Sequence, residues 1–155
     1  MDEQIDILKG LMNGEYFSFK GEFYDIPELK LCPAPTKPVP ILIGGHSKLA
    51  LKRAARIGDG WISAGITLDE TKEFIDQINI FRKEYGTLDH PNYQFQVMGE
   101  AAYSPDGIKN LEDLGATEVI VAFRNAYEGG KDERTLDGMI AEMNWYAEEV
   151  INKSR

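Results

Sequence analysis

The chain has 155 residues, of which 43% are apolar and 28% charged, and its formal net charge is -9 at pH 7. This length is enough for one hydrophobic core but short for two full domains, so we expect a single domain over residues 1–155. The acidic charge balance offers no electrostatic footprint for nucleic acid or for an anionic membrane surface, so we expect neither partner.

The first residues of the chain carry two predictions, one of a helix and one of the cellular compartment. Apolar residues recur at helical spacing from Ile5 to Met12, and Asn13-Gly14 supplies a left-handed stop. The residues Met1 to Gln4 lack the cationic and apolar character of a secretory segment, which favours the cytoplasm. No apolar run approaches the roughly 18 residues that a membrane span needs.

A small hairpin and a stiff connector complete the first forty residues. Phe17 and Phe19 alternate with polar neighbours, Lys20-Gly21 can turn the chain, and Phe23-Tyr24 can return it. The prolines between Cys32 and Pro40 then keep the backbone extended. With a single cysteine and two histidines in the chain, we expect no disulfide and no metal site.

Four strand-helix units are predicted from residue 41 onward. The strands are expected at Ile41, at Trp61, from Tyr93 to Tyr103, and from Thr117 to Phe123, the last one buried on both faces. The helices are expected to follow Ser47, Thr67 and Ser104, and a long helix from Leu136 to Ile151 closes the chain. Because strands that alternate with helices lie mostly parallel, an α/β fold follows.

The turn Gly44-Gly45 is the first candidate site. It follows a predicted strand and precedes the helix that Ser47 caps, so its backbone N–H groups and the helix N-terminus could grip a phosphate. A tight strand-to-helix turn that needs glycine only for its conformation is the alternative, and both interpretations stay open at this point. Neither a Walker loop nor a dinucleotide-binding fingerprint is present.

Two adjoining segments carry a family resemblance. PVPILIGGHS (38–47) and ALKRAARIGDGW (50–61) together resemble the signature of the luciferase-like monooxygenase family, which includes FMN-dependent and deazaflavin-dependent members. The helix, hairpin and proline connector before them, and the strand-helix units after them, fit the same family with less diagnostic residues. The resemblance favours the phosphate-binding interpretation of the glycine turn.

The resemblance also implies which part of the fold is present. Members of the family form (β/α)8 barrels, which typically need about 250 residues. This chain would supply the last four strands, with residues 1–40 as helix, hairpin and connector and residues 41–155 as four strand-helix units. The first four strands would be absent, which leaves sheet edges open and predicts self-association or pairing with a separate N-terminal half.

The resemblance and the strand order together place the candidate site at the carboxyl ends of the strands, where barrel enzymes bind their ligands. Asp59 and Trp61 are interpreted as structural. No residue is assigned a catalytic role. The predicted cofactor-binding residues are Gly44, Gly45, His46, Ser47, Ser63, Ala64 and Gly65, and weaker candidates for a substrate or phosphate contact are Glu100, Arg124 and Asn125.

Three functional hypotheses remain. The first is an oxidoreductase or monooxygenase that uses FMN or a deazaflavin, with the protein orienting the cofactor that carries the chemistry for an unknown small-molecule substrate. The second is a flavin- or phosphate-binding half-barrel without catalysis, which self-associates or pairs with an N-terminal half. The third is a fragment with no independent function.

Overall fold

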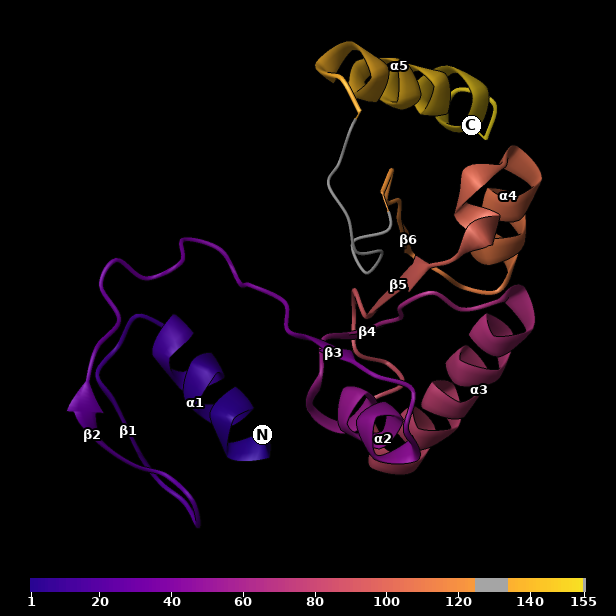
Figure 1. Ribbon diagram of the computed structural model, residues 1–155. Helices are drawn as coiled ribbons and strands as arrows, with labels where there is room; N and C mark the ends of the chain where they lie inside the picture. The colour runs from indigo at the N-terminus through magenta and orange to yellow at the C-terminus, as the bar shows by residue number, and fades with distance from the viewer. Residues whose placement is uncertain (125–133, 155) are drawn as a thin grey trace.

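A helix and a hairpin precede a parallel sheet whose strands alternate with helices (Figure 1). The computed structural model describes residues 1–124 and 134–154. The four-stranded sheet has the order β3-β4-β5-β6, and each neighbouring pair is parallel. The predicted α/β class is therefore confirmed, and the sequential strand order is that of half a β/α barrel.

The N-terminal arm consists of α1 (Asp2–Met12), β1 (Phe17–Lys20) and β2 (Asp25–Leu29). The helix ends where the sequence predicts, at Asn13 followed by Gly14 with φ +72°. The two strands pair antiparallel, which confirms the hairpin.

The turn of this hairpin differs from the sequence prediction. Phe23 and Tyr24 lie in the turn, and the return strand begins at Asp25. The carboxylate of Glu3 on α1 accepts hydrogen bonds from the backbone N–H groups of Glu22 at 2.7 Å, Phe23 at 3.0 Å and Tyr24 at 3.1 Å. These bonds occupy the backbone donors of the turn and hold it against α1.

The central strands and helices follow the predicted order. The sheet comprises β3 (Leu42–Gly44), β4 (Gly60–Ile62), β5 (Gln94–Met98) and β6 (Glu118–Ile120). Between them run α2 (Lys48–Ile57), α3 (Leu68–Tyr85) and α4 (Pro105–Asp113). The core between sheet and helices includes the buried side chains of Trp61, Leu51, Ile78, Val97 and Leu111.

The predicted caps fix where these helices begin. The hydroxyl of Ser47 accepts from the N–H of Ala50, and that of Ser104 accepts from the N–H of Gly107. Thr67 and Glu70 form the predicted capping box, in which each side chain accepts from the other residue's backbone N–H.

The third strand of the sheet is shorter than predicted. It ends at Met98, and Glu100–Tyr103 forms a short 3-10 helix, η1, instead of continuing the strand. The chain changes direction at Gly99, where only glycine fits, because a Cβ there would lie 2.4 Å from the carbonyl oxygen of Ile66. The apolar residues from Ala101 to Tyr103, which the sequence assigned to the strand, therefore belong to η1, where Ala102 is fully buried.

The fourth strand is also shorter, and it is not buried on both faces. Glu118 is exposed, and Val119 and Ile120 are half-buried. Because β6 lies at an edge of the sheet, one side of it has no neighbouring strand among the residues that the structure describes. The run of β-branched residues correctly predicted a strand, but not its exposure.

The closing helix is present as α5 (Leu136–Tyr146), which continues into a π-helical turn, η2 (Ala147–Ile151). Tyr146 and Val150 are buried, and the Tyr146 hydroxyl donates to the carbonyl oxygen of Ala102 at 2.8 Å. The remaining large apolar residues of this helix are mostly exposed, a feature that bears on how the fold is completed.

Candidate functional site

The predicted glycine turn lies at the carboxyl end of β3. Gly44 and Gly45 are both exposed, and Gly45 has φ +105°, a conformation that favours glycine. A Cβ on Gly44 would make ordinary van der Waals contact with Ile62 Cγ2 at 3.5 Å, so a small group fits beside this residue without displacing its neighbours. The turn thus leaves backbone accessible to a ligand.

The helix after this turn has an unusual distribution of charge. The first turn of α2 contains no acidic residue, whereas the first turns of α1, α3, α4 and α5 each contain at least one. An acidic residue there would offset the positive end of the helix dipole. The N-terminus of α2 therefore keeps its positive potential beside Gly44-Gly45, as an anion-binding site requires.

His46 joins the glycine turn to the loop after β4. Its ring stacks on Phe74, with 5.1 Å between ring centroids, and its Nε2 accepts a hydrogen bond from Ala64 N–H at 3.4 Å. Trp61 donates its indole N–H to the carbonyl oxygen of Gly45 at 3.0 Å. Gly44, Gly45, His46, Ser47, Ala64 and Gly65 consequently lie at the carboxyl ends of two adjacent strands, and all six are exposed.

Ser63 occupies a different environment from these exposed residues. It is buried, and its hydroxyl accepts a hydrogen bond from Met98 N–H at 2.9 Å. Its own N–H donates to the carbonyl oxygen of Gln96 at 3.0 Å. In the structure, the side chain of Ser63 thus links β4 to β5.

A cavity of about 550 Å³ lies at the carboxyl ends of β4 and β5. Gly65 and Glu100, predicted separately from the sequence, both line it. Sequence reasoning missed its other lining residues: Ile66, Thr67, Leu68, Gly99 and Ala101. Gly99 was the sequence signal that could have indicated this cavity. It follows β5, just as Gly44 ends β3 and Gly65 lies in the loop after β4.

Charge near this cavity is set partly by Glu70. Hydrogen bonds from the backbone N–H and the hydroxyl of Thr67 hold the pKa of the Glu70 carboxyl below its usual value, and nearby His46 contributes in the same direction. The α3 N-terminus is therefore occupied by its own capping carboxylate, in contrast to the N-terminus of α2.

The last two weak candidates lie after β6. Arg124 is exposed and follows the strand by four residues. Asn125 lies outside the described residues. Arg124 is not among the residues that line the cavity at the carboxyl ends of β4 and β5.

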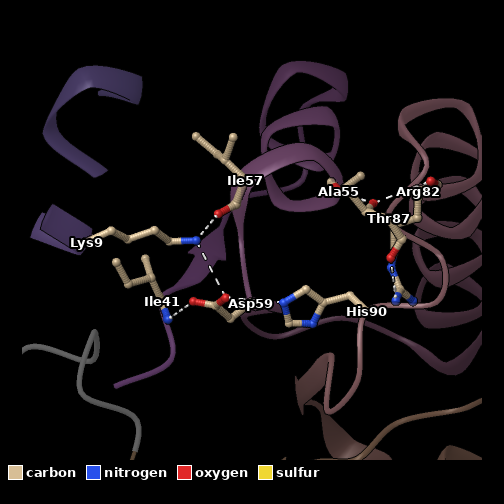
Figure 2. A network of polar contacts seen from close by, with 8 residues as sticks. All are labelled: Lys9, Ile41, Ala55, Ile57, Asp59, Arg82, Thr87 and His90. Carbon is tan, nitrogen blue, oxygen red and sulfur yellow. Dashed lines mark hydrogen bonds and ion pairs between the residues drawn. The ribbon is translucent and has the colours of Figure 1, made fainter. Parts of the chain in front are cut away.

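A polar network occupies the opposite, amino end of the sheet (Figure 2). Asp59 Oδ2 accepts from Ile41 N–H at 2.8 Å, and Oδ1 lies 3.6 Å from Lys9 Nζ and 3.8 Å from His90 Nε2. Lys9 also donates to the carbonyl oxygen of Ile57 at 2.7 Å. The contacts of Asp59 are thus with the start of β3 and with α1, far along the strands from the glycine turn.

Within residues 1–124 and 134–154, no group of three or more histidine, cysteine or acidic side chains is arranged to hold a metal ion. In the same part of the chain, no helix has both the length and the apolar character needed to cross a bilayer.

Comparison with known proteins adds relatives from several bacteria. An uncharacterized protein of Mycobacterium tuberculosis is 45% identical over 99% of this chain and 52% of its own length. The F420-dependent hydroxymycolic acid dehydrogenase of the same species is 34% identical over 45% of this chain and 19% of the enzyme. The FMNH(2)-dependent dimethylsulfone monooxygenase of Pseudomonas fluorescens is 32% identical over 50% of this chain and 21% of the enzyme.

Solved structures share the fold. An F420-dependent secondary alcohol dehydrogenase matches with a TM-score of 0.55 at 20% identity, over 72% of this chain and 34% of that one. A long-chain alkane monooxygenase matches with a TM-score of 0.52 at 18% identity, over 96% of this chain and 48% of that one. The chain therefore spans about half the length of the mycobacterial relative and half or less of these two structures.

A family model described as luciferase-like monooxygenase matches residues 1–133. This match includes α1, the hairpin and all four parallel strands, together with the glycine turn. The chain belongs to the luciferase-like monooxygenase family.

Proposed function

We propose that this chain forms the phosphate-binding half of a flavin- or deazaflavin-dependent oxidoreductase or monooxygenase. The cofactor phosphate would lie at Gly44-Gly45, next to His46 and Ser47, with Ala64 and Gly65 on the adjoining loop. The observation that carries the proposal is the exposed glycine turn at the α2 N-terminus, where no acidic residue offsets the helix dipole. The family membership supports the nature of the ligand.

The residues fit such a group physically. Gly44 has room for a ligand atom where a Cβ would stand, and Gly45 presents its backbone in the left-handed region. A bound reduced flavin or deazaflavin would supply the redox chemistry, while this chain binds and orients it. Relatives that use F420 and FMNH(2) support either cofactor.

The cavity at the carboxyl ends of β4 and β5 is the proposed location for the rest of the ligand. It begins at Gly65 and extends to Glu100, so it lies next to the proposed phosphate position. Glu100 remains a proposed contact, and Ser63, whose hydroxyl and backbone N–H both bond to β5, is proposed to hold the Ala64-Gly65 loop beside the ligand. Arg124 and Asn125 remain weaker proposals, for a substrate group carried by the loop after β6. The cytoplasm remains the compartment that we assign.

A second proposed function is phosphate binding without catalysis. The chain spans about half of its mycobacterial relative, and the proposed phosphate position lies within this part. In that case it is a binding module that self-associates or pairs with an N-terminal half. Turnover of reduced cofactor with an acceptor separates the enzyme from the module.

The phosphate position can be tested with two related flavins. FMN and riboflavin share the ring system, and FMN alone carries the phosphate. We expect the wild-type chain to bind FMN more tightly than riboflavin, as measured by quenching of flavin fluorescence. In Gly44→Val the added Cβ meets only ordinary contacts, and the branched side chain takes up space at the exposed turn, so the preference for FMN should be lost while the fold is kept.

Ser18→Val is a matched control, because it adds a similar side chain to an exposed strand position in the distant hairpin. Thermal unfolding of both variants checks that each remains folded. Equal affinities of the wild-type chain for FMN and riboflavin, or an unchanged FMN preference in folded Gly44→Val, would contradict the phosphate assignment. Titration with F420 then decides between the two cofactor classes.

A further inference from the structure

Two aromatic neighbours hold the ring of His46 in place. The ring stacks on Phe74 of α3, with 5.1 Å between the ring centroids and 17° between the planes, and its centroid lies 6.1 Å from that of Trp61. Trp61 is itself fixed, because it is fully buried and its indole N–H donates to the carbonyl oxygen of Gly45. The imidazole therefore has a defined position between the glycine turn and the loop after β4.

The hydrogen bond to this ring sets its protonation state. Ala64 N–H donates to His46 Nε2 at 3.4 Å. A ring nitrogen that accepts a hydrogen bond carries no proton, so the imidazole in this arrangement is neutral, with its proton on Nδ1. The bond is long for an N–H donor, so breaking it costs little. The Ala64 N–H is thus bound by the histidine but is easily released.

A proton on Nε2 would reverse this contact. In the charged imidazolium both ring nitrogens are donors, so Nε2–H of His46 and the N–H of Ala64 would face each other without an acceptor. An oxyanion placed between them would accept from both groups. The bond from the charged ring would be of the stronger, charge-assisted kind. Protonation of this one ring therefore converts a donor–acceptor pair into a two-donor anion site.

This pair of donors lies beside the proposed phosphate position. His46 follows Gly45 directly, and Ala64 follows β4, the strand that pairs with β3. Both residues are exposed, so an anion can reach them from solvent. The helix that begins after Ser47 has no acidic residue in its first turn, so no carboxylate of that turn competes with the anion.

The charged groups of the neighbouring elements are few. On α3, Glu70 lies four positions before Phe74 and so shares its helix face. Hydrogen bonds from the backbone N–H and the hydroxyl of Thr67 hold the pKa of Glu70 below its usual value, so this carboxylate is charged at neutral pH and favours a proton on His46. The first residue of α2 is Lys48, whereas β3 and residues 60–65 contain no titratable side chain.

We propose that His46 is a proton-dependent switch of the phosphate site: the neutral ring binds the N–H of Ala64, and the protonated ring releases it, so that both groups donate to the phosphate. This inference rests on the proposed phosphate position and deepens it by naming its regulation. One proton is taken up from solvent as the phosphate binds. By linkage, the phosphate must then bind more tightly as the pH falls through the range in which histidine gains its charge.

The first experiment compares FMN with riboflavin between about pH 5.5 and 8, with quenching of flavin fluorescence as the signal. The FMN phosphate itself loses charge near about pH 6, so a baseline is needed. His46→Gln supplies it, because glutamine keeps an acceptor for Ala64 N–H but does not titrate. The variant also keeps Lys48, Glu70 and Glu100, so a difference between the two pH profiles belongs to His46.

We expect the preference for FMN over riboflavin, divided by that of His46→Gln, to rise about tenfold from the highest to the lowest pH. This is the effect of one pKa unit of coupling between the ring and the phosphate. His90→Gln is the matched control, because His90 is the second of the two histidines of the chain and lies near Asp59. It should keep the profile of the wild type. Thermal unfolding checks that each variant is folded.

A second measurement needs no variant. The pH titration of the His46 ring and of the Ala64 amide is followed by NMR, once in sulfate and once in chloride of equal ionic strength. Sulfate keeps its full charge over this range, so a change in the titration comes from the protein. We expect the ring to titrate at higher pH in sulfate, and the Ala64 amide resonance to move together with it.

The switch is overturned if the profiles of the wild type and His46→Gln coincide, or if the Ala64 amide does not follow the ring. Coincident profiles with a preference for FMN at every pH would leave the proposed phosphate position standing. An equal affinity for FMN and riboflavin at every pH would instead contradict the phosphate position, and the switch with it.

Discussion

At the residue scale, Tyr93 carries a buried hydroxyl group that has no hydrogen-bond partner among the described residues. Burial is the main cause that raises the pKa of its phenol far above the ordinary value of 10.0. The folded state therefore keeps the proton, while the unfolded state loses it above about pH 10. The stability contributed by the neutral form is complete below that pH and is lost as the pH rises toward the folded-state pKa.

This predicts that Tyr93→Phe reduces the loss of stability at alkaline pH. The phenyl ring keeps its contact with Arg82, whose guanidinium lies 3.9 Å from the ring centroid. At neutral pH the variant should be as stable as the wild type or up to ~1 kcal/mol more stable, because an unpartnered hydroxyl is removed. Urea unfolding between about pH 7 and 11 measures both effects.

Tyr85→Phe is the control, because Tyr85 is 40% exposed and its hydroxyl is accessible to water. If Tyr93→Phe loses as much stability at high pH as the wild type, the buried phenol is not the source of the alkaline sensitivity.

Asp59 gives a second prediction at this scale. Its hydrogen bond from Ile41 N–H is 2.8 Å long, whereas its contacts with Lys9 and His90 are longer, at 3.6 and 3.8 Å, and partly exposed. Exposed ion pairs contribute little, so the bond to the backbone should dominate. Asp59→Asn keeps an acceptor and should cost at most ~1 kcal/mol, whereas Asp59→Ala leaves Ile41 N–H without one and should cost ~1–3 kcal/mol.

Chemical unfolding of the two variants measures this difference, and flavin titration measures the site. Neither substitution should change cofactor affinity, because Ile41 and Asp59 precede β3 and β4, whereas the glycine turn lies at the carboxyl end of β3. Equal destabilisation by both substitutions would show that the ion pairs, and not the backbone bond, anchor the start of β3.

At the element scale, the capping box of α3 predicts that the stability of the fold decreases at acidic pH. The hydrogen bonds from Thr67 lower the pKa of Glu70, so the stability they contribute is present above the ordinary value of 4.5 and lost as the pH falls through the folded-state pKa. Thr67→Ala should cost ~1 kcal/mol at neutral pH. Glu70→Gln should destabilise at about pH 7 and have little effect at about pH 3.

Thermal unfolding at both pH values tests this, with Glu84→Gln as the control on the same helix. Glu84 is exposed near the other end of α3, so its substitution should have little effect at either pH. A loss of stability in Glu70→Gln that is the same at both pH values would exclude the charge of Glu70 as its cause.

The elements also show what a sequence can predict. Ser47, Thr67 and Ser104 cap their helices as predicted, because a cap depends on residues within one turn. The prediction of where β5 ends was wrong, because the end lies where Gly99 approaches Ile66, a contact across 33 positions of sequence. The prediction that β6 is buried on both faces was also wrong, because the burial of a strand depends on which elements lie beside it.

The candidate site follows the same division. The glycine turn and the helix that Ser47 caps are local features, so their geometry could be predicted from spacing, while the role of Gly44, Gly45 and Ser47 in holding a phosphate stays a proposal. The stacking of His46 on Phe74 and the cavity shared by Gly65 and Glu100 join separate loops, and spacing alone does not contain them. Ser63 illustrates the limit, since its hydroxyl bonds to β5 rather than lying exposed with its neighbours.

At the scale of the whole molecule, the proposed cofactor site and one of the two outer strands of the sheet share the same residues. The proposed phosphate position lies on β3, which is also an outer strand. A strand paired to β3 would therefore end beside Gly44-Gly45, within reach of the same cofactor. Completion of the sheet and binding of the cofactor should consequently be coupled.

This coupling gives the last prediction. By linkage, the factor by which an N-terminal half, added as a separate polypeptide, increases the affinity of this chain for FMN must equal the factor by which FMN increases the affinity between the two polypeptides. Couplings of this kind typically amount to about 5–150-fold. Fluorescence titration of FMN with and without the added half measures the first factor, and titration of one labelled polypeptide with the other, with and without FMN, measures the second. Riboflavin in place of FMN separates the contribution of the phosphate from that of the ring. An FMN affinity that does not change when the half is added would mean that this chain alone makes all the contacts with the cofactor, and the open edges would then serve the fold and not the site.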